Sequence, residues 1–392
     1  MWGLIDCDNF FCSCERVFRP DLNGVPVVVL SNNDGCVVAR TREVKAMGVP
    51  EGMPYYQLLE KYPRSGIVAF SSNYELYGDM SARIMAILQQ ETPEVIQYSI
   101  DEAFVNLSGI DLSLLKGWGE ALCRKVRRWT GMPISLGIGP TKTLAKVAVR
   151  FAKDYPGYHK CCVIASDEQR EKALKLFPVG KVWGIGRRLA AKLNYHGVAT
   201  AYDLTQRQRG WVRAQMHVTG ERTWQELCGI PAIDLGDLNS TTRKSIMTSR
   251  SMPGMIDNLE DLATHVANHA ARSARKLRAQ HSVCELVTVF VQSNRFRDDL
   301  PQYENSASLS FATATDSTIE IVGAAKRLLA SIFRPGILYK RAGVMVSGIH
   351  SAEFVQPDLF DYDPERAGRH SSISAAIDEI NRRLGMDTVI LA

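Results

Sequence analysis

The chain has 392 residues, of which 45% are hydrophobic and 23% are charged, and its formal net charge is +5. This is a globular composition with room for two to four domains, and the mild basic excess suits a polyanionic partner without requiring one. No apolar run reaches the roughly 18 residues that a membrane span needs, and the N-terminal sequence M-W-G-L-I-D-C-D-N-F has no basic stretch followed by a long apolar one, so we expect neither a span nor a signal peptide. The nine cysteines contain no C-x-x-C pair, which argues against a disulfide framework or a zinc ribbon and favours a reducing cytoplasm.

Predicted strands and helices alternate through the first 165 residues. A strand that begins at Ile5 breaks into polar and aromatic residues by Phe11. The other predicted strands are 25–30, 95–107 and 134–138, and the predicted helices are 41–47, 74–90, 114–129 and 141–153. Alternation of this kind is typical of a layered domain in which helices cover a sheet.

The second half of the chain changes character twice. Residues 166–230 are mostly helical in pattern, with a glycine-rich turn, V-W-G-I-G, at 182–186, and an uneven polar stretch follows. From 246 to 349 the pattern predicts strand, helix (259–280), strand (283–291), strand (306–313), helix (318–332) and strand (342–349). This βαββαβ order is that of a split, ferredoxin-like unit.

Two adjacent carboxylates stand in the middle of the strand predicted at 95–107, in the sequence Q-Y-S-I-D-E-A-F. Asp101 and Glu102 could lie at a strand end or bulge and be solvated or salt-bridged, because unpaired acids under an apolar cover are costly. The D-C-D sequence at 6–8 also stands where an apolar strand stops. Carboxylates from two strand ends can instead converge on Mg²⁺. Since neighbouring strand residues point to opposite faces, Asp101 and Glu102 could both reach a metal only near a turn or distortion.

The segment G-I-G-P-T-K-T at 137–143 is not a P-loop. That motif places a glycine directly before its lysine, and Thr141 stands there.

Four ordered motifs resemble the Y-family DNA polymerases, and in particular their UmuC-type members. They are D-C-D-N-F-F at 6–11, S-N-N-D-G-C-V-V-A-R at 31–40, Y-S-I-D-E-A-F at 98–104 and G-I-G-P-T-K-T-L-A-K at 137–146. The resemblance covers nearly the whole chain and implies an α+β multidomain, right-hand polymerase fold. The implied parts are a palm (1–10 and 74–165), fingers (11–73), a helical thumb with a helix–hairpin–helix (166–232), a linker (233–245), a ferredoxin-like little finger (246–350) and a tail (351–392).

The resemblance also implies a chemistry. It is error-prone translesion DNA synthesis in SOS-type damage tolerance and mutagenesis, with nucleotidyl transfer from a dNTP to a primer 3′-OH and no proofreading exonuclease. The implied catalytic and metal-binding residues are Asp6, Asp101 and Glu102, with the backbone carbonyl of Cys7 as a further ligand and two Mg²⁺ as cofactors. Two such ions stabilise the attacking and leaving oxygens of an in-line displacement.

The nucleotide-binding residues implied by the resemblance are Phe10, Phe11, Arg42, Lys45 and Lys153. Without that context, two adjacent aromatics are ordinary packing and a single lysine is a solvated helix residue. Phe11 takes the place of the steric gate that excludes a 2′-hydroxyl, where many UmuC-like members carry Tyr. Lys45 stands where many Y-family enzymes have an Arg paired with a Tyr three residues earlier; here the pair is Arg42 and Lys45, and Lys lacks the bidentate fork of Arg.

The turn at 182–186 resembles the hairpin of a helix–hairpin–helix. Gly184 and Gly186 would let backbone N–H groups approach a DNA phosphate, although such turns are common. Near the first strand of the little finger, Arg243, Lys244 and Arg250 are the implied DNA contacts. Phosphate contacts of this kind carry no sequence code and weaken with salt.

The tail carries Q-P-D-L-F at 356–360, which fits the pattern by which bacterial polymerases dock on the sliding clamp. Gln356, Leu359 and Phe360 are its expected anchors. The further partners implied by the resemblance are primer–template DNA, a UmuD′-like accessory dimer and a RecA filament, in a bacterial, nucleoid-associated and cytoplasmic setting, with no membrane. Two other hypotheses are a nucleotide cyclase, which shares a two-metal palm, and a non-catalytic DNA-binding relative.

Overall fold

The structure is a computed structural model that describes residues 1–236, 243–358, 363–385 and 388–389. The chain separates into two compact units, 1–239 and 240–392. Within the described residues, no helix is long and apolar enough to cross a membrane.

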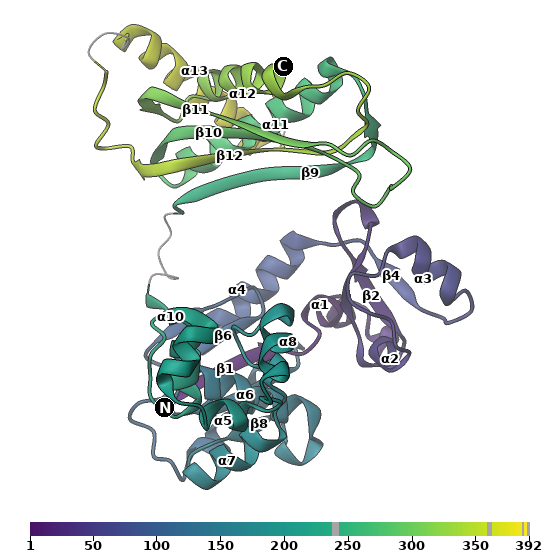
Figure 1. Cartoon of the computed structure of the whole chain (residues 1–392), viewed down its shortest axis with the longest axis vertical. Helices are drawn as coiled ribbons and strands as arrows, with labels where there is room; N and C mark the ends of the chain where they lie inside the picture. Colours follow the sequence, from purple (N-terminus) through teal and green to yellow (C-terminus); the bar gives the residue numbers. More distant parts are fainter. Residues whose placement is uncertain (237–242, 359–362, 386–387, 390–392) are drawn as a thin grey trace. The chain divides into compact units, whose positions relative to one another are not determined.

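A five-stranded sheet forms the centre of the first unit (Figure 1). Its strands are β1 (Trp2–Cys7), β5 (Val95–Gln97), β6 (Glu102–Asn106), β7 (Ile134–Gly139) and β8 (Cys161–Val163). They lie in the order β5-β6-β1-β7-β8. The central strand β1 runs antiparallel to both of its neighbours, β6 and β7.

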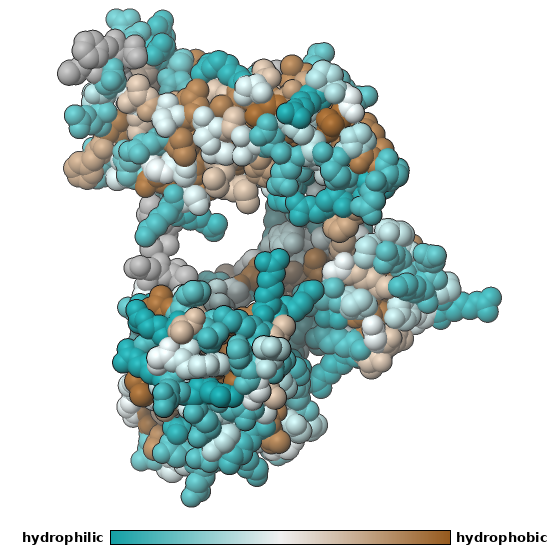
Figure 2. All heavy atoms as spheres, in the orientation of Figure 1, coloured by the Kyte–Doolittle hydropathy of each residue, from teal (hydrophilic) through white to brown (hydrophobic). Residues whose placement is uncertain are grey.

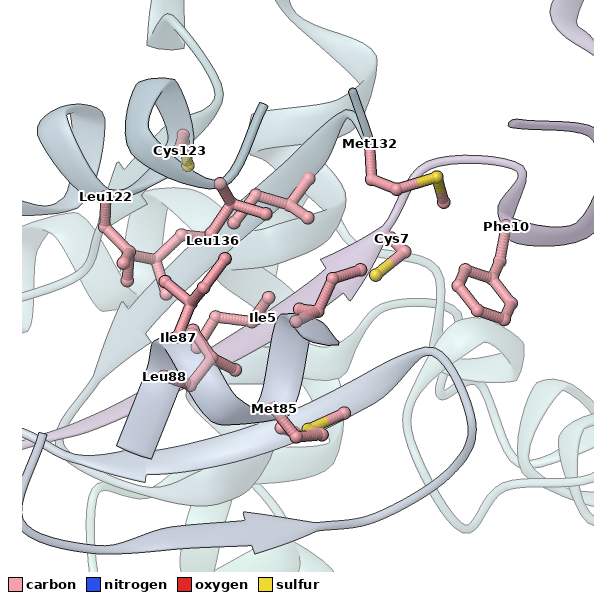
Figure 3. Close-up of a cluster of buried hydrophobic side chains, with 14 of the residues drawn as sticks. Ile5, Cys7, Phe10, Met85, Ile87, Leu88, Leu122, Cys123, Met132 and Leu136 are labelled. Carbon is pink, nitrogen blue, oxygen red and sulfur yellow. The ribbon is translucent and has the colours of Figure 1, made fainter. Parts of the chain in front are cut away.

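Helices cover both faces of this sheet. On one face, α4 (Tyr74–Glu91) and α5 (Leu115–Thr130) contribute to a buried cluster that includes Ile5 and Cys7 of β1. Figure 3 shows the side chains of Ile5 and Cys7 in this cluster. Because neighbouring strand residues point to opposite faces, the residue between Ile5 and Cys7 and the residue before Ile5 point to the opposite face of the sheet.

The opposite face packs against α6 (Lys142–Asp154), whose Ala145 and Val149 form a cluster with Leu4 and Phe104. The helix lies very close to the sheet at Gly137 of β7, where an added Cβ would be 2.0 Å from the backbone nitrogen of Val149. Only glycine permits this approach, which sets how near the side chains of α6 come to β1 and β6.

Residues after β1 form α1 (Phe10–Phe18) and a small second sheet, in the order β3-β2-β4. The strands and helices of this region are β2 (Val27–Leu30), β3 (Val37–Arg40), β4 (Val68–Phe70), α2 (Arg42–Ala46) and α3 (Tyr55–Lys61). Single 3-10 turns occur at η1 (Pro20–Leu22), η2 (Asn32–Asp34) and, later in the chain, η3 (Pro156–Tyr158).

A helical region completes the first unit. It contains α7 (Asp167–Leu176), η4 (Val179–Lys181), α8 (Arg187–Tyr195), α9 (Ala201–Thr205) and α10 (Arg209–Leu227). The buried carboxylate of Glu226 joins this region to the sheet domain, because it accepts hydrogen bonds from the backbone N–H groups of Thr143, at the start of α6, and of Ala232 and Ile233.

The second unit is a four-stranded antiparallel sheet in the order β11-β10-β12-β9. Its elements are β9 (Ser245–Ile256), α11 (Leu259–Ala279), β10 (Ser282–Ser293), β11 (Glu304–Thr315), α12 (Thr318–Ile332) and β12 (Tyr339–Ser351). Both helices pack into the core of the sheet, and the predicted βαββαβ order is confirmed. A further helix, α13 (Pro364–Leu384), is held by an ion pair between Asp378 and Arg278 of α11.

Two predictions of strand extent are wrong. The strand predicted at 95–107 is two strands, β5 and β6, separated by residues 98–101. The strand predicted to begin at Ile5 is β1, which begins at Trp2 and ends at Cys7; Asn9 then has a left-handed φ of 50°, and α1 begins at Phe10. At 98–101, turn chemistry overrides the apolar pattern.

Candidate active site

Asp6 and Glu102 are direct cross-strand partners in the antiparallel pair of β1 and β6. Residues opposite one another in such a pair point to the same face. That face is the one covered by α6, because Leu4 and Phe104, two residues from each acid, pack there. The strand register therefore brings together two acids that are far apart in sequence.

Asp101 lies in the turn between β5 and β6, so strand alternation does not direct its side chain. The hydroxyl of Ser99 donates to Asp101 Oδ1 at 2.6 Å, and its oxygen accepts from the backbone N–H groups of Asp101 and Glu102 at 3.2 and 3.0 Å. The backbone N–H of Cys7 donates to the carbonyl of Asp101 at 2.9 Å. This turn is the distortion that two adjacent acids need if both are to face one site.

Two lysines of α6 pair with these carboxylates. Lys153 Nζ lies 2.5 Å from Asp6 Oδ1, and Lys146 Nζ lies 3.0 Å from each carboxylate oxygen of Glu102. Positions seven residues apart stand two turns apart on one side of a helix. One face of α6 thus carries the counter-charges of both acids.

Burial raises the pKa of Asp6 to about 6, from an ordinary value of 3.8. The Lys153 ammonium opposes this shift, while the nearby charges of Glu102 and Asp101 add to it. The pKa of Asp6 is therefore raised by poor solvation and by the two carboxylates that lie near it.

A cavity of about 390 Å³ opens beside the two acids. Its charged lining consists of Asp6, Glu102, Lys146, Arg150, Lys153 and Lys181. Four cations against two carboxylates give this cavity a net positive lining, which attracts a polyphosphate.

Asp6 and Glu102 fit a hard divalent cation by their chemistry, because carboxylate oxygens are the ligands that Mg²⁺ prefers. Within the described residues, no three His, Cys, Asp or Glu side chains form a group that could hold a metal, and lysines pair with the acids. The Cys7 thiol is buried in the core on the other face (Figure 3), so only the backbone of Cys7 is available to a ligand on the Asp6 side.

The two predicted nucleotide-contacting aromatics lie in different surroundings. Phe10 is buried at 4% exposure in the core of the first unit. Phe11 is half-buried and stacks on Tyr77 with ring centroids 4.4 Å apart, and Tyr74 meets it edge-on at 5.8 Å. The ring of Phe11 is therefore held in position by its contacts with Tyr77 and Tyr74.

The three predicted basic contacts come close to one another. Arg42 Nη2 donates to the backbone carbonyl of Lys153 at 3.3 Å, and Lys45 Nζ donates to Asn9 Oδ1 at 2.6 Å. Burial lowers the pKa of Lys45, and the neighbouring charges of Arg40, Lys153 and Arg150 lower it further. Cations packed this closely repel one another unless an anion lies among them.

The glycine-rich turn lies between η4 and α8. Gly184 has a left-handed φ of +85°, and Gly186 is the N-cap of α8. The helix then exposes Arg187, Arg188 and Lys192. Figure 2 shows a mainly hydrophilic surface over α7 and α8.

In the second unit, Arg243 and Lys244 are exposed just before β9. Arg250 pairs in register with Ala342, whose side chain is buried under the helices, so the Arg250 side chain leaves the edge strand toward the helical side of the sheet. Gln356 is exposed, while Leu359 and Phe360 lie outside the described residues.

Sequence reasoning missed Lys146 as a site residue, together with Trp183 and Lys181 of the cavity wall. The available signal for Lys146 was its place seven residues before Lys153, which puts both lysines on one side of the helix. Trp183 carried no such signal, because its contacts with Tyr98 and Phe104 join segments that are far apart in the sequence.

Comparison with known proteins gives a consistent result. Residues 5–150 match the model of the impB/mucB/samB family, and residues 243–359 match the model of its C-terminal domain. The chain is 40% identical to the protein UmuC of Salmonella typhimurium over 100% of this chain and 93% of that protein. It is 38% identical to MucB of Escherichia coli over 98% and 90% of the two chains, and 29% identical to DNA polymerase IV of Corynebacterium diphtheriae over 91% and 77%.

The fold agrees with solved structures of the same class. A Y-family DNA polymerase chimera of Dbh and Dpo4 superposes with a TM-score of 0.71 at 19% identity, over 89% of this chain and 99% of that one. An insertion ternary complex of Dbh DNA polymerase gives 0.56 at 19% identity, over 89% and 99%. The predicted fold class and family are confirmed: the chain belongs to the impB/mucB/samB family and is a Y-family, UmuC-type translesion DNA polymerase.

Proposed function

We propose that nucleotidyl transfer takes place at the end of β1 and β6, with Asp6, Asp101 and Glu102 holding two Mg²⁺. The observation that carries this proposal is the register of Asp6 with Glu102 on the α6 face, with Asp101 in the adjoining turn. The backbone carbonyl of Cys7 is a fourth ligand. When bound, the ions supply charge stabilisation for the attacking and leaving oxygens.

The residues around the acids bind and orient the dNTP. Lys153, Lys45 and Arg42 contact the triphosphate, whose negative charge offsets the mutual repulsion of these closely spaced cations. Phe11, backed by Tyr77, lies against the deoxyribose and excludes a 2′-hydroxyl by its volume. Phe10 acts from the core by fixing the start of α1.

DNA binding is shared between the two units. Backbone N–H groups at Gly184 and Gly186 bind a primer–template phosphate, and the exposed cations of α8 add to the attraction. In the second unit, Arg243 and Lys244 contact DNA phosphates, and Arg250 does so from the sheet edge. Affinity then falls steeply with salt.

The same proposal covers the partners. The sliding clamp binds through Gln356, Leu359 and Phe360, and a UmuD′-like dimer and a RecA filament assist synthesis on damaged templates. The setting is the bacterial cytoplasm at the nucleoid.

Primer extension by the lone chain tests the site. Asp101→Ala is expected to reduce the rate of extension on the order of 10³-fold. This loss is three tenfold steps in rate, each of which corresponds to about 1.4 kcal/mol of transition-state stabilisation. Ser108→Ala, an exposed position just beyond β6, is the matched control and retains extension. Equal extension by the wild-type and Asp101→Ala proteins would refute the proposed site, and product formed without primer would point to a cyclase.

A further inference from the structure

Lys146 occupies a cage of three aromatic rings. Its ammonium nitrogen lies 4.5 Å from the ring centroid of Tyr98, 5.2 Å from that of Trp183 and 6.0 Å from that of Phe104. All three distances are within the range of cation–π attraction. The same nitrogen is paired with both carboxylate oxygens of Glu102.

The cage is assembled from three separate parts of the first unit. Phe104 belongs to β6, Tyr98 precedes the turn that carries Asp101, and Trp183 belongs to the turn at 182–186 of the helical region. The Trp183 indole Nε1–H donates to the Tyr98 hydroxyl at 3.0 Å. The cage thus joins the proposed DNA-binding hairpin to the strand that carries Glu102.

The burial of Lys146 means that its ammonium group needs a partner at all times, and the aromatic rings can supply one. Its side chain is 16% exposed, and a buried charge that loses its partner is strongly destabilising. If Glu102 turned toward a divalent cation, the ammonium would lose its carboxylate. The three ring faces supply an alternative partner, so the lysine can stay in place while the carboxylate moves.

We propose that Lys146 is a positioning residue for Glu102: it aims the carboxylate when no metal is bound and competes with the divalent cation for it, while the aromatic cage retains the ammonium once Glu102 is released. This inference rests on the proposed metal-binding role of Glu102. Removing the Lys146 charge should strengthen cation binding, and removing a ring should weaken it.

The test measures Mn²⁺ binding to the full chain from the free-ion signal in electron paramagnetic resonance, because Mn²⁺ shares the oxygen-ligand preference of Mg²⁺. Lys146→Met is expected to bind Mn²⁺ roughly tenfold more tightly, the effect of one well-placed charge pair. Lys146→Arg should bind it more weakly than wild type, because a guanidinium grips a carboxylate bidentately. Unchanged Mn²⁺ affinity in both variants would overturn the proposal.

A matched control is available in Lys175. It also combines a carboxylate, Glu171 at 3.3 Å, with a ring, Tyr202 at 4.5 Å, but it belongs to α7 and does not line the cavity. Lys175→Met should leave Mn²⁺ affinity unchanged. A shift equal to that of Lys146→Met would mean that net charge alone sets the affinity, which would overturn the positioning role.

The cage is tested at Trp183. Trp183→Phe keeps a ring and should leave Mn²⁺ affinity within about twofold, whereas Trp183→Leu removes the ring and should weaken Mn²⁺ binding by roughly threefold to tenfold. Equal affinities in the two variants would overturn the role of the cage.

A double-mutant cycle separates this inference from the proposed function. In a Glu102→Gln background, Lys146→Met should no longer change Mn²⁺ affinity, because the competition has no carboxylate. If Glu102→Gln itself retains full primer extension, the proposed function fails. If it loses extension while the Lys146 variants leave Mn²⁺ binding unaltered, only the present inference fails.

Discussion

Lys153 Nζ lies 2.5 Å from Asp6 Oδ1, which joins a predicted triphosphate contact to a predicted metal ligand in one ion pair. The pair is largely buried, with side-chain exposures of 24% and 16%. Buried pairs of this kind cost desolvation that mutual attraction only partly offsets. A bound substrate that paired with Lys153 and a divalent cation that paired with Asp6 would relieve that desolvation cost.

The raised pKa of Asp6 predicts how the metal-free protein responds to pH. Its value of about 6 exceeds the ordinary 3.8, so between these values the native state binds more protons than the unfolded state. The contribution of Asp6 to stability is then fully present below about pH 4 and is lost as pH rises through about 6. The unfolding free energy of wild type should fall by up to about 3 kcal/mol relative to that of Asp6→Asn as pH rises from about 4 to 7.

The measurement is urea unfolding of both proteins in a chelator at several pH values. Taking the difference between them cancels the other titrating groups. If the unfolding free energy of wild type instead rises relative to that of Asp6→Asn as pH increases, then the attraction of Lys153 for the Asp6 carboxylate outweighs the effect of burial, contrary to this expectation.

Phe11 sets sugar selection by its volume. Phe11→Ala should raise ribonucleotide incorporation roughly 10- to 100-fold relative to deoxyribonucleotide, on the scale of steric discrimination in binding pockets. The measurement is single-nucleotide insertion with matched dNTP and NTP. Phe18→Ala, at the exposed end of the same helix, is the control and should not alter selection; unchanged selection in Phe11→Ala would refute the gate.

The two glycines of the turn at 182–186 differ in what they tolerate. Gly184 has a φ of +85° and an added Cβ would lie 3.3 Å from Thr223 Oγ1, whereas nothing lies within 4 Å at Gly186. Gly184→Ala should cost about 1–2 kcal/mol of unfolding free energy, and Gly186→Ala less than about 0.5 kcal/mol. Chemical denaturation, with DNA affinity measured in parallel, checks both. The expectation fails if the two variants are equally stable.

Glu226 is the buried link between α10 and the start of α6. It is 1% exposed and accepts backbone hydrogen bonds from Thr143, Ala232 and Ile233 at 2.8, 3.0 and 3.1 Å. Glu226→Ala leaves these N–H groups without a partner, and we expect a loss of about 2–4 kcal/mol in unfolding free energy. Glu171→Ala, which removes an exposed carboxylate paired with Lys175, should cost less than about 1 kcal/mol. Similar losses in the two variants would contradict the link.

Local chemistry made much of the architecture predictable. The helix 318–332 has the bounds predicted from its pattern, because Ser317 caps it by accepting from the backbone of Glu320 and the apolar spacing within it is strictly local. The same holds for the βαββαβ order of the second unit. The break at 98–101 was not predicted, since the Ser99 hydrogen bonds that make the turn compete with an uninterrupted apolar pattern.

By itself, the sequence determined the order of most of the long helices and strands and which residues carry charge, because caps, turns and apolar periodicity act over a few residues. Only the tertiary structure decided which charges meet. Asp6 faces Glu102 through the register of two strands, and Lys146 and Lys153 reach them because Gly137 lets α6 lie close to the sheet. Register and helix–sheet distance depend on packing between distant segments, and no local pattern in the chain encodes them.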